Sequence, residues 1–223
     1  MEQYKWADPQ KRTAFPVAEA GYPFIFAGGF ITAVFALTGL TVPAMISLIF
    51  WSFTCWFFRD PDRVIPIGDG LVVSPADGRV IKTDIVPESP LGESTSLKIS
   101  IFMSVFNVHV NRIPCDGAIT GVSYFPGKFF SANLDKASED NEHNQIFMQT
   151  DTGQSVCFVQ IAGLVARRII CHLTGNETVA RGQRFGMICF GSRLDVYLPA
   201  DTRLRVKIGD KVKAGTSVLG SFQ

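Results

Sequence analysis

The sequence lacks an excess of charge of either sign, since it holds 21 basic and 20 acidic residues among 223. Bulk nucleic-acid binding usually needs a strongly basic surface, so nucleic acid is not an expected partner. The sequence also lacks paired cysteines: its five cysteines are scattered and form no Cys-X-X-Cys motif. This pattern argues against a disulfide framework and against a zinc site, and it suits a reducing compartment. We therefore expect no metal.

Charge is absent altogether from residues 20–58. A membrane-spanning helix needs roughly 20 apolar residues, so this stretch is long enough for two short ones. Gly39 and Pro43 supply a break, which predicts an apolar helical hairpin with arms at 22–39 and 43–58. Residues 1–58 are accordingly predicted to be an N-terminal membrane-associating region.

Basic residues flank the apolar stretch on both sides: Lys11 and Arg12 precede it, and Arg59 and Arg63 follow it. Positive charge at both ends favours a hairpin whose two ends are cytoplasmic, which places the protein at the cytoplasmic face of the cell membrane. Each arm is slightly short, so two full spans and an interfacial hairpin both remain open. A cleaved signal peptide fits poorly, because the apolar run is too long and starts too late.

Beyond residue 58 the composition changes to short β-branched runs separated by Gly, Pro, Asn and Asp, which is typical of an all-β domain. Residues 59–223 are predicted to be this β domain, and residues 126–145 a long polar loop of the kind that is often functional. The expected strands include 71–73, 80–81, 97–103, 155–161, 165–172, 187–190, 194–198 and 204–207.

Two segments of this domain share a loose pattern, SPADGRVIKT at 74–83 and VKIGDKVKAGTSVLG at 206–220. The second is similar to the strand-turn-strand of lipoyl and biotinyl hammerhead domains. No acceptor lysine occupies a hairpin tip, so the pattern predicts a hammerhead-like (barrel-sandwich) architecture without the carrier function.

A Gly-Ser pair at Gly191-Ser192 lies between two apolar alternating runs. Glycine tolerates unusual dihedral angles, so a strained turn there would expose the Gly191 carbonyl to attack by the Ser192 hydroxyl. The resulting ester could eliminate to dehydroalanine and hydrolyse to a pyruvoyl group. Taken alone, however, Gly-Ser is most often an ordinary turn or bulge.

Six ordered blocks of sequence change that balance, and they cover nearly all of residues 57–199. The blocks are FFRDPDR (57–63), VVSPADGRV (72–80), ISIFMSVFNVHVNRIPCDG (99–117), YFPGKFFSANLDKASEDNEHN (124–144), GLVARRIICHL (163–173) and FGSRLDVYLP (190–199). With these blocks in this order, the chain resembles the short form of the pyruvoyl-dependent phosphatidylserine decarboxylases.

The resemblance implies a proenzyme that cuts itself into a large chain, 1–191, and a small chain, 192–223, which stay together as a heterodimer. A higher oligomer is left open. Ser192 would become a covalent pyruvoyl group, with no added cofactor and no metal. Its ketone would form a Schiff base with phosphatidylserine and accept electrons as carbon dioxide leaves, giving phosphatidylethanolamine.

The resemblance also assigns catalytic roles. Asp77 matches the family's acidic residue for self-cleavage, although Asp-Gly is equally an ordinary turn. His109 would be a proton donor or base near the pyruvoyl group. Alternation places it on one face of an apparent strand with Asn107 and Asn111.

Long-form members carry a second histidine three positions after the first, where this chain has Arg112. The self-cleavage base therefore stays open. Arg112 is instead a candidate to bind the substrate carboxylate or phosphate, for which a guanidinium is suited. Arg168 is a second candidate for the lipid phosphate, with a surface role as its alternative. His143 is a third candidate, although a solvated loop histidine is the simpler interpretation.

Two other functions are compatible with parts of the sequence. One is a pyruvoyl enzyme for a soluble amino acid, which the uncharged stretch at 20–58 disfavours. The other is a membrane-anchored β adaptor or carrier without catalysis.

Overall fold

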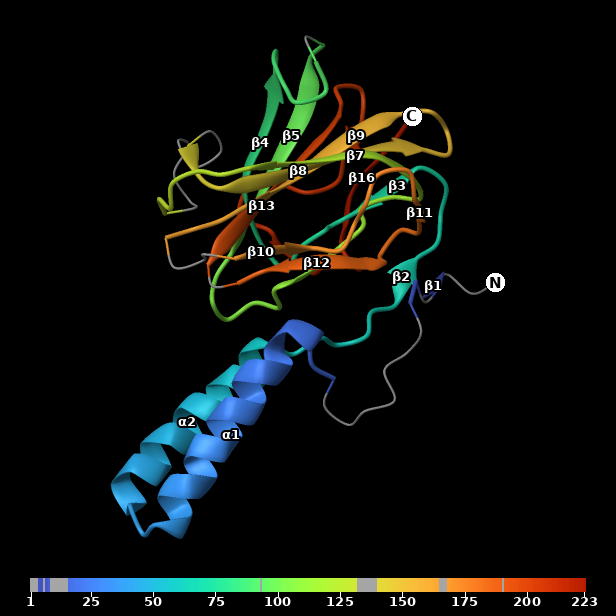
Figure 1. Cartoon of the computed structure of the whole chain (residues 1–223). Helices are drawn as coiled ribbons and strands as arrows, with labels where there is room; N and C mark the ends of the chain where they lie inside the picture. Colours follow the sequence, from blue (N-terminus) through green and yellow to red (C-terminus); the bar gives the residue numbers. More distant parts are fainter. Residues whose placement is uncertain are drawn as a thin grey trace. The chain divides into compact units, whose positions relative to one another are not determined.

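The structure, a computed structural model, describes residues 4–5, 7–8, 16–92, 94–131, 140–164, 168–189 and 191–223. The chain forms two compact units, one of residues 10–62 and one of residues 1–9 with 63–223. The expectation of a mainly β fold preceded by an apolar helical hairpin is confirmed (Figure 1).

The smaller unit holds the 3-10 helix η1 (Glu19–Gly21) and the helices α1 (Tyr22–Leu37) and α2 (Thr41–Phe57). The turn between the helices contains Gly39 with φ +76°, a conformation that glycine adopts without strain. Pro43 lies in the first turn of α2 rather than in the break, because a first-turn residue needs no intrahelical N–H partner. The two helices pack through Trp51, whose Nε1 donates to the Ile25 carbonyl at 2.8 Å.

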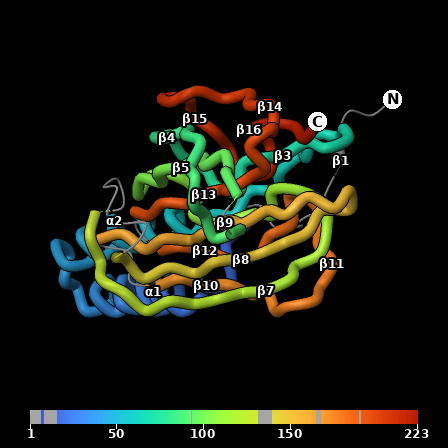
Figure 2. The backbone as a smooth tube through the Cα atoms, turned by 90° about the horizontal axis from the view of Figure 1, so that it is seen from above, coloured from blue at the N-terminus to red at the C-terminus, as the bar shows by residue number. Residues whose placement is uncertain are grey.

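The larger unit is built around an eight-stranded antiparallel sheet (Figures 1 and 2). Figure 2 shows β7, β8 and β9 lying side by side along it. Its strands, in spatial order, are β11 (Thr178–Val179), β7 (Gly117–Phe125), β8 (His143–Thr150), β9 (Ser155–Ile161), β13 (Ser192–Pro199), β5 (Ser96–Met103), β4 (Gly78–Val86) and β15 (Lys211–Val212).

Three smaller antiparallel sheets complete this unit. The first pairs β10 (Ile169–Cys171), β12 (Arg184–Ile188) and β6 (Val110–Arg112); the second pairs β14 (Arg203–Leu204), β16 (Val218–Ser221) and β3 (Leu71–Val73); the third pairs β1 (Tyr4–Lys5) with β2 (Ile65–Pro66).

The core lies on one face of the eight-stranded sheet, which we call the inner face. On β13 the buried residues Leu194, Val196 and Leu198 belong to this core, while the alternate residue Tyr197 belongs to a small cluster on the other, outer face. Since side chains alternate along a strand, Ser192 shares the inner face with Leu194. The reacting position predicted from the sequence therefore lies in the protein interior.

The two segments of similar sequence, 74–83 and 206–220, lie against each other. The Ser74 N–H donates to the Ser217 carbonyl at 2.8 Å, and the Ser74 carbonyl accepts from the Gly215 N–H at 2.7 Å. Val80 makes the corresponding pair of backbone hydrogen bonds with Asp210 and Gly209, at 2.9 and 2.8 Å. This mutual pairing of the two turns fixes the loop that carries Asp77.

Several element predictions are wrong in part. The strand expected at 204–207 is limited to Leu204, the last residue of β14. The strand expected at 165–172 is limited to β10, and residues 165–167 lie outside the described part of the chain. The loop expected at 126–145 ends earlier, because β8 begins at His143, where it pairs with Phe125 on β7 and Ile161 on β9. Residues 132–139 of that loop also lie outside the described part.

Candidate active site

Ser192 is the first residue of β13 and is fully buried. It pairs with Met103, the last residue of β5, and its Oγ donates to the Met103 sulfur at 3.4 Å. A thioether is a weak hydrogen-bond acceptor, so this contact holds the hydroxyl only loosely. Among the residues that the structure describes, the buried hydroxyl therefore has only this weak acceptor.

Gly191 precedes Ser192 with φ +60°, in the left-handed region that L residues rarely adopt. No described atom lies within 4 Å of where its Cβ would be, so the backbone angle and not space demands glycine. Gly191 is also only half-buried, in contrast to Ser192. The Gly191-Ser192 peptide therefore joins a conformationally unusual, partly exposed glycine to a buried serine.

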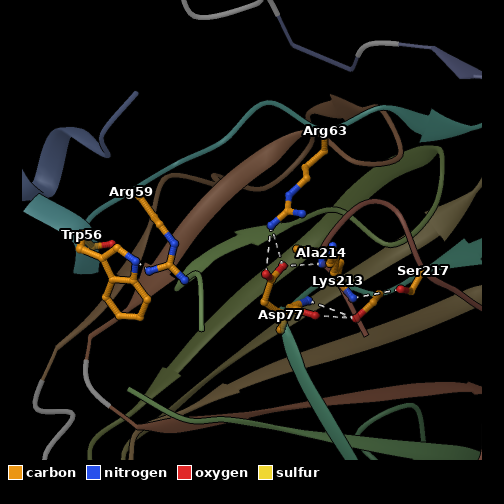
Figure 3. Close-up of polar contacts among 9 residues, drawn as sticks. Trp56, Arg59, Arg63, Asp77, Lys213, Ala214 and Ser217 are labelled. Carbon is orange, nitrogen blue, oxygen red and sulfur yellow. Dashed lines mark hydrogen bonds and ion pairs between the residues drawn. The ribbon is translucent and has the colours of Figure 1, made fainter. Parts of the chain in front are cut away.

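Asp77 lies in the turn between β3 and β4, and its carboxylate has well-defined partners (Figure 3). Arg63 donates to both oxygens through Nη2, at 2.9 and 3.2 Å, and the Ala214 N–H donates to Oδ1 at 2.8 Å. Asp77 directly precedes β4, whose neighbour β5 ends at Met103 beside Ser192. Asp77 and Ser192 are therefore at the same end of three adjacent strands, roughly 10 Å apart across them.

His109 is fully buried and directly precedes β6. Its carbonyl accepts from the Ile188 N–H at 3.4 Å, at the end of the strand that leads to Gly191. At the last residue of β6, the Arg112 N–H donates to the Pro75 carbonyl at 2.9 Å. Pro75 belongs to the turn that carries Asp77. Backbone pairing thus brings the segments of Ser192, Asp77 and His109 into one region.

The prediction that Asn107 shares a strand face with His109 and Asn111 is wrong, because β6 begins only at Val110. Asn107 lies in a turn, where its Oδ1 accepts from the N–H and the Oγ of Ser104 at 2.9 and 2.8 Å. Such side-chain bonds to a nearby backbone group favour a turn over a strand.

The three candidates for substrate binding occupy different places. Arg112 is buried, and its Nη1 donates to the Gly182 carbonyl at 2.8 Å and lies 3.5 Å from Asp8. His143 is half-buried, with its ring stacked on Phe125 at 4.8 Å between centroids. Because the next residue, Asn144, is buried on the inner face, His143 belongs to the outer face, opposite Ser192.

Arg168 is exposed and lies beside the segment that leads to the Gly-Ser pair. Its carbonyl accepts from the Cys189 N–H at 3.1 Å. Burial raises the pKa of the Cys189 thiol, and the positive charge of Arg168 opposes part of that rise. The guanidinium is therefore near residue 189, and Arg168 is the best placed of the three candidates to meet a ligand at Ser192.

Sequence reasoning missed a row of buried amides next to Ser192. Asn111 and Gln160 are fully buried, and Asn144 is nearly so. Asn144 Nδ2 donates to Gln160 Oε1 at 3.1 Å, and Gln160 Nε2 donates to Asn111 Oδ1 at 2.9 Å. A signal was available only for Gln160, a single amide within the apolar run 156–162, because Asn111 and Asn144 lie among other polar residues.

A second missed feature is a buried charge cluster on the outer face of β13 and β5. Asp195 is fully buried and accepts from Arg193 Nε at 2.6 Å and Nη2 at 3.0 Å, and Lys98 Nζ lies 3.2 Å from its Oδ2. Arg193 Nη2 also donates to Ser100 Oγ at 2.9 Å. The cluster fixes the residue that directly follows Ser192. Over the residues that the structure describes, no group of three His, Cys, Asp or Glu side chains is arranged to hold a metal ion.

Comparison with known proteins identifies the family of this chain. The family model for phosphatidylserine decarboxylase matches residues 50–220, and the chain belongs to this family of decarboxylases. The predicted resemblance, and with it the prediction of an enzyme, is confirmed.

Individual relatives share about half of the sequence over nearly their whole length. The phosphatidylserine decarboxylase proenzyme of Syntrophus aciditrophicus is 52% identical over 208 residues, covering 92% of this chain and 97% of the relative. The proenzyme of Nitrosomonas europaea is 51% identical, covering 92% and 95%. The proenzyme of Desulfotalea psychrophila is 47% identical, covering 93% and 97%. The word proenzyme in these names denotes a precursor.

Proposed function

We propose that the chain cuts itself at Gly191-Ser192 and then decarboxylates phosphatidylserine to phosphatidylethanolamine and carbon dioxide. The observation that carries the proposal is the pairing of a left-handed glycine with a fully buried serine whose hydroxyl contacts only a weak acceptor among the described residues. In this step the Ser192 Oγ attacks the Gly191 carbonyl carbon, and the peptide bond is replaced by an ester. Elimination then breaks the Cβ–Oγ bond of this ester, which gives the large chain, 1–191, and the small chain, 192–223, held as a heterodimer.

Asp77 and His109 are proposed to assist this chemistry. The Arg63 ion pair and the Ala214 N–H fix the position of the Asp77 carboxylate, whose proposed role is to orient a base or accept a proton. His109 directly precedes β6, which runs between the turn of Asp77 and the segment leading to Gly191, where a proton donor or base is required. The assignment of the self-cleavage base between them is a matter for mutagenesis.

The site fits a pyruvoyl group derived from Ser192. The pyruvoyl group retains the three carbons of the serine, so the enclosed space around Ser192 accommodates it. Hydrogen bonds of β13 with β5 and β9 would hold the small chain in place after cleavage. When formed, the group supplies an electron sink for decarboxylation of an amino acid headgroup.

Membrane attachment is proposed for the helical unit. The segment Glu19–Leu37 is long and apolar enough to cross a membrane by length and composition, and α2 is a shorter apolar helix. Large apolar side chains are exposed along both helices, among them Phe26, Phe30, Ile49 and Phe50. At the end of α2, Arg59 lies 3.8 Å from the centre of the Trp56 ring (Figure 3), a pair typical of membrane interfaces.

This attachment suits a lipid substrate, because phosphatidylserine stays in the bilayer. We propose a location at the cytoplasmic face of the cell membrane. Arg168 is the proposed contact for the lipid phosphate or carboxylate. Arg112 and His143 are retained as weaker proposals, since Arg112 is engaged with Gly182 and His143 belongs to the outer face of the sheet.

The test is intact-mass measurement of the purified protein in detergent, with a phosphatidylserine decarboxylation assay on the same sample. Wild type should yield a small chain, 192–223, that resists Edman sequencing, and Ser192→Ala should stay a full chain of about the wild-type 24.5 kDa and be inactive. Recovery of only the full chain from wild type, with equal activity in Ser192→Ala, would show that the proposal is wrong. A cleaved enzyme acting on free serine instead would point to a soluble substrate.

A further inference from the structure

Asn111 presents a poorly satisfied donor beside the reacting serine. The residue is fully buried, and its Nδ2 donates to the Met103 sulfur at a distance of 3.8 Å. Buried amide N–H groups normally have an oxygen acceptor, and a thioether is a weak substitute. The same sulfur accepts from Ser192 Oγ at 3.4 Å, so the amide and the hydroxyl adjoin one atom.

The orientation of this amide is fixed by its neighbours. The Ile170 carbonyl can only accept, so the group that faces it at 3.3 Å must be the Gln160 NH₂. That NH₂ also donates to Asn111 at 2.9 Å, so the Asn111 atom receiving it must be the oxygen. The opposite side of the Asn111 amide, which faces the Met103 sulfur that Ser192 also contacts, is therefore the N–H donor.

A stronger acceptor for this donor arises during self-cleavage. In the proenzyme, Ser192 Oγ carries a hydrogen and donates, as Asn111 Nδ2 does. Once Oγ has attacked the Gly191 carbonyl and become the ester oxygen, it has no hydrogen and can only accept. The neighbouring N–H then has an oxygen acceptor in place of sulfur.

We propose that Asn111 stabilises the carboxylate that leaves in the elimination step, an inference that rests on the proposed function. A base removes the Cα proton of residue 192, the Cα=Cβ bond forms, and the Cβ–Oγ bond breaks. Its electron pair goes to Oγ, which becomes part of the new carboxylate of Gly191. Water then replaces the amino group of the dehydroalanine, releasing ammonia and leaving the ketone.

A donor that is already oriented stabilises developing negative charge without reorganising at the moment of reaction. Gln160 and Asn144 are positioning residues in this scheme, because they act through Asn111. The assignment is specific to the elimination: the preceding shift from amide to ester leaves Oγ uncharged, so it depends less on this donor.

The experiment compares wild type with Asn111→Leu and Asn111→Asp, each as the full chain in detergent. Asn111→Asp keeps the shape of the side chain and an acceptor for Gln160 but replaces the N–H donor, so it decides the question if Asn111→Leu does not fold. Gln149→Leu, an exposed amide on β8, is the matched control. Circular dichroism reports folding, and mass spectrometry follows the chains with and without hydroxylamine, which cleaves esters in preference to amides.

We expect the folded Asn111 variants to form the pyruvoyl-blocked small chain about 10²-fold more slowly than wild type and Gln149→Leu. Hydroxylamine should restore cleavage in them and release a small chain that begins with intact Ser192. Folded variants that mature at the wild-type rate overturn the inference, and so do variants that stay uncleaved and insensitive to hydroxylamine. Failure of the proposed function looks different, because wild type itself would then remain uncleaved with or without hydroxylamine.

Discussion

At the scale of single residues, the backbone angle of Gly191 is the feature most directly tied to self-cleavage. Its φ of +60° costs little for glycine, but about 1–2 kcal/mol for most L residues. Because no described atom lies within 4 Å of the position that a Cβ would occupy, steric contact adds nothing to that penalty. Substitution at Gly191 therefore tests backbone conformation without a packing defect.

We expect Gly191→Ala to slow self-cleavage by roughly 5- to 30-fold, the rate equivalent of about 1–2 kcal/mol, if the reactive geometry requires this angle. Gly191→Asn should fall between alanine and wild type, because asparagine tolerates the left-handed region better. The measurement is the half-time of cleavage on a denaturing gel.

The matched control is Gly153→Ala in the turn between β8 and β9. Gly153 has φ +87° and also has no described atom within 4 Å of its Cβ position, so the backbone penalty is similar. It should lower stability but leave the cleavage half-time unchanged. Equal half-times for Gly191→Ala and wild type would contradict the role of the angle.

At the scale of secondary-structure elements, the pairing of β13 with β5 is the contact that must survive cleavage. β13 begins at the predicted cut, so its charged residues Arg193 and Asp195 belong to the small chain, whereas Lys98 and Ser100 belong to the large chain. The buried cluster on the outer face therefore joins the two predicted chains.

We expect Asp195→Asn to destabilise the protein by about 3–5 kcal/mol, because it removes the carboxylate that the buried Arg193 and the half-buried Lys98 contact. Lys98→Met should cost less, since the Arg193–Asp195 pair remains and Lys98 is less completely buried. Urea unfolding of the full chain in detergent measures both. Unfolding of Asp195→Asn at the wild-type urea concentration would show that the cluster contributes little.

The elements show where sequence patterns succeed and where they fail. The strands at 71–73 and 155–161 were predicted with their observed bounds, since both are short apolar runs bounded by turn residues. His143 was assigned to a loop because no local period marks the start of β8. Its strand character comes from pairing with Phe125 and Ile161, which lie 18 residues away on either side of it in the chain.

Some residues of the candidate site could be predicted from the sequence, and others could not. Ser192, Asp77 and His109 were found because ordered sequence blocks resemble a known family, which identifies residues one by one. Asn111 was noticed only as a neighbour of His109 on a strand. Its relation to Gln160 and Met103 depends on three strands that are distant in sequence, and no spacing rule within one segment predicts it.

At the scale of the whole molecule, buried thiols make stability depend on pH in the alkaline range. Burial raises the pKa of Cys157 to about 12, and burial also raises the pKa of Cys115 well above its ordinary value. In the unfolded chain these thiols titrate near 9.0. The folded state therefore keeps protons that the unfolded state has lost, and the associated stability, complete below about pH 9, falls as the pH rises towards 12.

We expect the free energy of unfolding to decrease by about 1.4 kcal/mol per pH unit for each such thiol above about pH 9. Cys157→Ala should remove one such contribution from the slope, whatever its effect on stability at neutral pH. Ser155→Ala, an exposed position on the same strand, should leave the slope unchanged. Urea unfolding of the three proteins at several pH values between about 8 and about 10 gives the slopes. Equal slopes for Cys157→Ala and wild type would mean that Cys157 does not titrate differently in the folded and unfolded chains.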